Sequence, residues 1–175
     1  MRYVVAALIA TLSAAPAFGA DAPAIVRIDL KNSAGASVGQ ATLTQATSGV
    51  LARIEVKGLT PGWHGLHFHE TGDCSKSDFT SAGGHVHAMA TKVHGLLNPD
   101  LNEAGDLPNL FVAADGSGTV ELLSTFVSLR GPGPRPALAD KDGSALVIHA
   151  GPDDYISQPI GGAGARTACG VIPAG

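Results

Sequence analysis

Three features of the sequence predict an all-β fold: frequent turn residues, few charges, and short segments in which apolar and polar residues alternate. The 175 residues include 23 Gly and 11 Pro, and only 15% are charged. Few windows therefore have the composition of an amphipathic helix. Short alternating segments separated by Gly-rich turns favour a sandwich or a flattened Greek-key barrel of eight or so strands.

The first expected strands follow one another at short intervals. Within residues 26–30, apolar Val26, Ile28 and Leu30 alternate with Arg27 and Asp29, as in a strand with one buried face. Turn residues at 32–35 precede a second strand at 38–43, and Pro61-Gly62 ends a third at 50–56. A short extended segment is expected at 63–69.

Beyond Glu70 the chain loses periodicity for about forty residues, as far as Leu107. Long irregular loops in a compact domain are usually functional or pinned in place. Alternation then resumes, and the remaining strands are expected at 110–113, 119–123, 145–149 and 168–172. We find no internal repeat and no second domain.

Residues 1–20 have the pattern of an export signal, with Arg2 before an apolar run at 4–12 and small residues at Gly19 and Ala20. We expect cleavage after one of these two, a single domain over 21–175, and a periplasmic or otherwise exported protein.

Charge and hydropathy exclude two classes of partner. Without Arg2, 10 Lys and Arg stand against 15 Asp and Glu, a net charge of −5. This balance argues against binding to nucleic acid. No apolar stretch after the leader is long enough to span a membrane. The sequence leaves the oligomeric state open.

The two cysteines, Cys74 and Cys169, are expected to form one disulfide because exported proteins meet an oxidising environment. Two separate buried thiols are the alternative. In the chain-entropy model, closing a loop of this length stabilises a protein by on the order of 4–5 kcal/mol.

The histidines suggest a metal site. His67 and His69 lie two residues apart, so on a strand both rings leave the same face. His64 has the opposite parity and is expected to hydrogen-bond to the backbone. The other candidates are His85, His87, His94, Glu103, Asp106 and His149. Neutral imidazoles suit copper and zinc, and a carboxylate among them suits zinc better than copper(I), so two neighbouring metals are expected.

Five segments resemble the bacterial copper/zinc superoxide dismutases. They are GWHGLHFHE at 62–70, SAGGH at 81–85, GDLP at 105–108, VIH at 147–149 and GARTACGVI at 164–172. The resemblance runs from about Ile25 to Ile172, and the motifs are jointly very specific. It implies an eight-stranded Greek-key flattened β-barrel with long metal-binding loops, in agreement with the strand count above.

The resemblance also implies a role for each matching residue. Copper would be bound by His67, His69, His85 and His149, and zinc by His85, His94 and Asp106, with the His85 imidazolate bridging the two. Cys74 and Cys169 match the family disulfide. Asp153 matches a carboxylate that links a copper histidine to a zinc histidine, and Arg166 matches a guanidinium beside the copper channel. Without the resemblance, Asp153 would be read as a turn cap after Pro152 and Arg166 as a surface ion pair.

The sequence departs from the family pattern near the second metal. Glu103 stands where the family normally has its third zinc histidine, nine residues after His94 and three before Asp106. Glu103 can bind zinc through oxygen, or it can be a solvated loop residue beside a weak or empty second site. His87, where the family usually has Asp or Asn, is an alternative ligand. Leu66 replaces a common aromatic residue, which is a tolerated core change.

The expected function is superoxide dismutation, with His85 as a proton carrier and Arg166 as the anion guide. Lys76 or Lys92 would help to steer the anion despite the negative net charge. The rival function is a copper-binding or copper-storage protein on the same barrel, which would have no use for Arg166.

Overall fold

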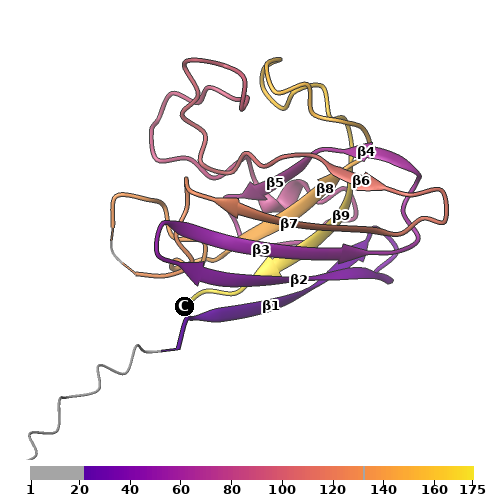
Figure 1. Ribbon diagram of the computed structural model, residues 1–175, viewed down its shortest axis with the longest axis horizontal. Helices are drawn as coiled ribbons and strands as arrows, with labels where there is room; N and C mark the ends of the chain where they lie inside the picture. Colours follow the sequence, from indigo (N-terminus) through magenta and orange to yellow (C-terminus); the bar gives the residue numbers. More distant parts are fainter. Residues whose placement is uncertain (1–21, 132) are drawn as a thin grey trace, which may run out of the picture.

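Alternating side chains form a strongly curled antiparallel sheet of seven strands in the computed structural model, which describes residues 22–131 and 133–175 (Figure 1). The expected leader at 1–20 lies outside the described residues. Along the sheet the strands are β5 (Leu66–His69), β8 (Ser144–His149), β9 (Arg166–Ile172), β1 (Ile25–Asn32), β2 (Ser37–Ala46), β3 (Gly49–Val56) and β7 (Gly118–Ser124).

A smaller sheet of two strands, β4 (Gly62–His64) and β6 (Leu110–Val112), continues the edges of the large one. After Gly65, β4 leads directly into edge strand β5, and a tight turn joins β6 to the opposite edge strand β7. The expected all-β, Greek-key barrel architecture is confirmed.

The strand at 63–69 differs in detail from the prediction, because it divides at Gly65. Trp63 pairs with Phe111 in the small sheet, whereas Leu66 pairs with Ile148 in the large one. The N–H of Gly65 donates to the carbonyl oxygen of Gly151 at 2.7 Å, outside both sheets. The described residues therefore form nine strands, together with a short 3-10 turn at Thr80–Ala82.

The core lies inside the curled sheet. On β1, Val26, Ile28 and Leu30 are buried and the intervening residues are exposed, as their alternation predicts. Strand β8 is buried on both faces because Leu146 and Ile148 join the main core while Ala145 and Val147 join a second apolar cluster.

The second apolar cluster pins the loop after β5 onto the outside of the sheet. Phe79 and Ala82 pack in this cluster beside Cys169, which forms a disulfide with Cys74. The expectation of one disulfide is confirmed, and the alternative of separate thiols is wrong. Among the described residues, no helix is long and apolar enough to cross a membrane.

Candidate metal centre

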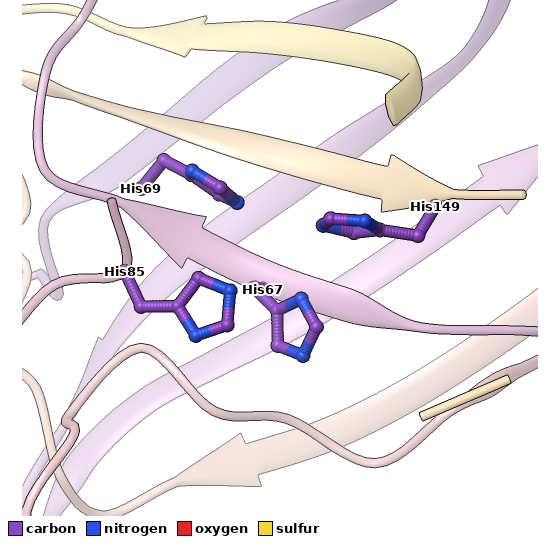
Figure 2. A group of neighbouring side chains, drawn as sticks. All are labelled: His67, His69, His85 and His149. Carbon is purple, nitrogen blue, oxygen red and sulfur yellow. The ribbon is translucent and has the colours of Figure 1, made fainter. Parts of the chain in front are cut away.

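Strand parity places three histidines on the outer face of the sheet. On β5, Leu66 and Phe68 point into the core, so His67 and His69 leave from the opposite face. On the paired strand β8, Ile148 joins the core and His149 follows it at a register irregularity. Figure 2 shows these three rings and that of His85 pointing toward one another. All four rings are buried, and two long loops lie above the sheet at the top of Figure 1.

The loop that carries His85 and Asp106 is attached to β5 by backbone hydrogen bonds. The N–H of Phe68 donates to Gly105 at 2.9 Å, and the N–H of Val86 donates to Phe68 at 2.9 Å. A Cβ at Gly105 would collide with the carbonyl oxygen of Phe68, so this approach requires glycine. It brings His85 beside His69 and Asp106 beside His67.

In this first group, one ring nitrogen of each histidine has a hydrogen-bond partner and the other has none. His67 Nε2 donates to Asp153 at 2.9 Å, while Nδ1 of His69 and Nδ1 of His149 donate to the carbonyl oxygens of Gly83 and Gly164 at 3.0 Å. The buried nitrogens without a partner in the described chain are His67 Nδ1, His69 Nε2, His85 Nε2 and His149 Nε2. The bonds of the first three rings fix the tautomer in which the unpartnered nitrogen carries a lone pair.

Burial keeps these imidazoles neutral. It lowers the pKa of His69 to about 2 and that of His149 to about 3, with further lowering by the neighbouring rings and Arg166. Burial also lowers the pKa of His67 to about 4, although the bond to Asp153 partly opposes it. These three neutral imidazoles and the unpartnered Nε2 of His85 converge on one space, a set of nitrogen donors suited to copper or zinc.

A second group lies on the other side of His85. His85 Nδ1 is 2.8 Å from Glu103 Oε2 and 3.1 Å from Asp106 Oδ1. His94 Nδ1 is 3.2 Å and 2.9 Å from the same two oxygens. Two nitrogens and two carboxylate oxygens thus share one buried space, a donor set acceptable for zinc.

Proximity alone gives a slightly different second group. His67, His85, His94 and Asp106 offer donor atoms within 4.8 Å of one another. His67 uses Nε2 for Asp153, however, and its remaining Nδ1 belongs with the first group. Glu103 instead contacts the Nδ1 atoms of both His85 and His94. We therefore count Glu103, and not His67, as the fourth donor of the second group.

Charges in the second group stabilise one another. Burial opposes protonation of His94, but the bonds to Asp106, Asp153 and Glu103 outweigh it and raise its pKa to about 11. Burial likewise opposes the raised pKa of His85, whose bonds to Asp106 and Glu103 dominate. The same bonds overcome burial and lower the pKa of the carboxyl groups of Glu103 and Asp106. Such a cluster favours a divalent cation in place of protons.

Asp153 joins the two groups. Its Oδ2 accepts from His67 Nε2 at 2.9 Å, and its Oδ1 accepts from His94 Nε2 at 3.1 Å. Oδ1 also accepts from the N–H of Tyr155 at 2.6 Å, so the carboxylate caps its turn as well. The two readings of Asp153 in the sequence are therefore compatible.

Arg166 is half-buried at the start of β9 and forms no ion pair with any described residue. Its Nη1 and Nη2 donate to the carbonyl oxygens of Phe79 and Gly83, both at 2.6 Å. Gly83 also accepts from His69, so Arg166 is fixed beside the first group. An anchored guanidinium with spare donors and no carboxylate partner is suited to binding an anion.

The remaining candidates lie outside both groups. His64 Nδ1 and Nε2 are 2.6 Å and 2.7 Å from the carbonyl oxygens of His149 and Thr60, which agrees with the expected backbone role. His87 Nδ1 lies near the His85 carbonyl oxygen and 3.2 Å from Glu70. Lys92 also contacts Glu70, at 3.3 Å.

The segment that carries both donor groups and most of this fold matches a known protein family. Residues 37–172 match the family described as copper/zinc superoxide dismutase. The chain belongs to the copper/zinc superoxide dismutase family. A superoxide dismutase [Cu-Zn] of Caulobacter vibrioides is 64% identical over 138 residues, covering 79% of each chain.

Solved structures agree with this membership. A SOD-like protein from Bacillus subtilis matches with a TM-score of 0.78 at 38% identity, over 85% of this chain and 99% of that one. The Cu/Zn superoxide dismutase from Brucella abortus matches with a TM-score of 0.68 at 31% identity, over the same shares.

Several supporting contacts of the site had no signal in the sequence. The carbonyl oxygens of Gly83 and Gly164 orient His69 and His149, and every residue type offers such an oxygen. Gln158 contacts the backbone of His94 although 64 residues separate them. The glycine-rich motifs at 81–85 and 164–172 marked the right segments, without indicating what their backbone does.

Proposed function

We propose that this protein disproportionates two superoxide anions, with two protons, into dioxygen and hydrogen peroxide. Copper is bound by His67, His69, His85 and His149, and zinc by His85, His94, Glu103 and Asp106. The observation that carries the proposal is the set of four convergent buried ring nitrogens without hydrogen-bond partners. These donors fit copper, and the mixed nitrogen and oxygen donors fit zinc.

Copper, when bound, supplies the one-electron redox chemistry by alternating between Cu(II) and Cu(I). The residues of the chain supply the other requirements. Arg166 attracts and orients the anion beside His69, since its guanidinium keeps donors free and forms no ion pair with a described carboxylate. His85 would hold a proton at Nε2 only while that nitrogen is not bound to copper, and would give this proton to the peroxide product. Asp153 holds the rings of His67 and His94 in place.

The periplasm is the proposed location. A disulfide between Cys74 and Cys169 forms and persists in an oxidising compartment, and the leader pattern at 1–20 suits export.

Superoxide consumption by copper-loaded protein tests the function. We expect rapid turnover, and we expect His149→Ala to abolish it. This variant keeps His64 and both cysteines, so an intact disulfide serves as a check on its folding. A rate no higher than that of the His149→Ala variant would contradict the proposal. Strong copper(II) binding by optical and spin-resonance signals without turnover would favour copper storage instead.

A further inference from the structure

Gln158 makes a two-point contact with the backbone of His94. Gln158 Oε1 accepts a hydrogen bond from the N–H of His94 at 2.9 Å, and Gln158 Nε2 donates to the carbonyl oxygen of His94 at 2.8 Å. In the reverse orientation of the amide, its NH2 group would face the His94 N–H and its oxygen would face the His94 carbonyl oxygen. The contacts themselves therefore select the orientation observed. Nε2 also donates to Ile156 at 2.9 Å, which ties the side chain to its own loop.

The backbone of His94 determines where its ring lies. Its ring is fully buried, with Nδ1 toward Asp106 and Glu103. The next N–H, of Gly95, donates to Asp106 Oδ2 at 2.7 Å. Side chains therefore hydrogen-bond to the peptide groups on both sides of the His94 Cα. One of these side chains is Asp106, and the other is Gln158, which comes from the loop after β8.

The loop of Gln158 packs closely on the segment of His94. The N–H of Leu97 donates to the carbonyl oxygen of Tyr155 at 3.1 Å. A Cβ at Gly95, where φ is +114°, would collide with that same oxygen. Both loops lie above the same end of the sheet, as Figure 1 shows. Loop 150–162 and segment 94–98 are therefore in close contact.

We propose that Gln158 is a positioning residue for the second metal site: its amide holds the His94 backbone so that Nδ1 faces Asp106 and Glu103. The inference rests on the proposed zinc site. By linkage, zinc bound at that site stabilises the contact between Gln158 and His94 to the same degree as the contact stabilises zinc.

The test is zinc retention by the fully loaded, full-length protein challenged with a colorimetric zinc chelator. We expect Gln158→Ala to release zinc roughly 10-fold faster, the lower end of the range for residues that support metal ligands. Gln158→Glu keeps the shape and the acceptor but opposes an oxygen to the His94 carbonyl oxygen. It should therefore release zinc at least as fast as the alanine variant, whereas a purely space-filling role would leave it unchanged.

Cobalt(II) substituted at the second site gives a spectroscopic signature of its geometry. We expect both Gln158 variants to change the visible cobalt bands. Ile156→Ala removes a neighbouring exposed side chain from the same loop and is the matched control, with zinc release within about twofold of the original protein. If the alanine variant misfolds, the isosteric glutamate variant carries the test alone.

Wild-type zinc release and cobalt bands in Gln158→Glu would overturn the inference, as would equal acceleration of copper and zinc loss with unchanged cobalt bands. Neither readout uses superoxide. A protein that needs Gln158 for zinc but lacks dismutase activity would keep this inference and contradict the proposed function, and the converse result would do the opposite.

Discussion

Glu103 is an oxygen donor at a position where the family pattern has a nitrogen donor. The structure places its carboxylate between His85 Nδ1 and His94 Nδ1. The side chain is also buried, which disagrees with a solvated loop residue. Carboxylate oxygens suit harder cations than imidazole does, so this exchange should weaken the preference for zinc over other divalent ions.

Substitution of Glu103 tests this chemistry. We expect Glu103→Ala to lower zinc retention under chelator challenge by about 10-fold or more, because one of two carboxylates in the site is lost. Glu103→His should raise retention and make it less sensitive to acid. Asp100→Ala, which removes an exposed carboxylate from the same loop, is the control. Unchanged zinc content and thermal stability in Glu103→Ala would mean that Glu103 is not a ligand.

Arg166 should affect the capture of substrate more than the binding of metal. We expect Arg166→Ala to lower kcat/KM for superoxide by roughly 10-fold to 100-fold, since electrostatic steering of this kind is worth 10 to 1,000-fold in association rate. Arg166→Lys should retain part of the rate, because it keeps the charge and loses the two-point anchor. Rapid-kinetic assays at several salt concentrations, with copper content measured in parallel, provide the check.

Arg53→Ala is the control for Arg166, since Arg53 lies on the exposed face of β3 and pairs with Glu55. Loss of copper equal to the loss of activity in Arg166→Ala would show that Arg166 acts on the metal site and not on the anion.

At the scale of elements, the strands were predictable and the loops were not. Alternation of Val26, Ile28 and Leu30 reports which face is buried, and it located β1 to within two residues at each end. Parity on β5 also predicted that His67 and His69 share a face. The break at Gly65 left no trace in the alternation, because it follows from a change of partner strand.

The loops bring together residues that periodicity cannot relate. Asp153 meets His67 across 86 positions and Gln158 meets His94 across 64. These contacts depend on the paths of loops and turns, which have no repeating sequence pattern. The residue types alone made His94 and Asp106 candidates for a metal site, whereas only the resemblance to known sequences gave them their place beside His85 and pointed to Asp153.

The disulfide loop is the element whose removal should have the largest effect. Cys74 and Cys169 close a loop with a separation of 95 residues. We expect Cys74→Ser to lower the free energy of unfolding of the metal-free protein by about 2–5 kcal/mol, measured by urea denaturation. Cys169→Ser should match it. The loop between Cys74 and Gly83 also anchors Arg166, so kcat/KM should fall in both variants even after copper is restored.

At the scale of the whole molecule, the buried histidines form two sets whose pKa values are shifted in opposite directions. His67, His69 and His149 have a lowered pKa because burial penalises their charged form. His85 and His94 have a raised pKa because carboxylates outweigh their burial. In the metal-free protein, these sets respond to pH in opposite directions.

The metal-free protein should therefore be most stable near pH 6.5, the ordinary pKa of histidine. Below that pH the unfolded chain binds protons at His67, His69 and His149 that the folded chain does not bind. Stability therefore falls as the pH drops from about 6.5 to about 2. Above it the folded chain retains protons at His85 and His94 that the unfolded chain releases, and stability falls as the pH rises toward about 11. Each histidine contributes at most about 1.4 kcal/mol per pH unit.

Midpoints of urea unfolding at several pH values measure the fall in stability on both the acid and the alkaline side. The His149→Gln variant should reduce only the fall on the acid side. A stability that rises steadily from pH 6.5 to 9 would contradict the protonated state assigned to the second group.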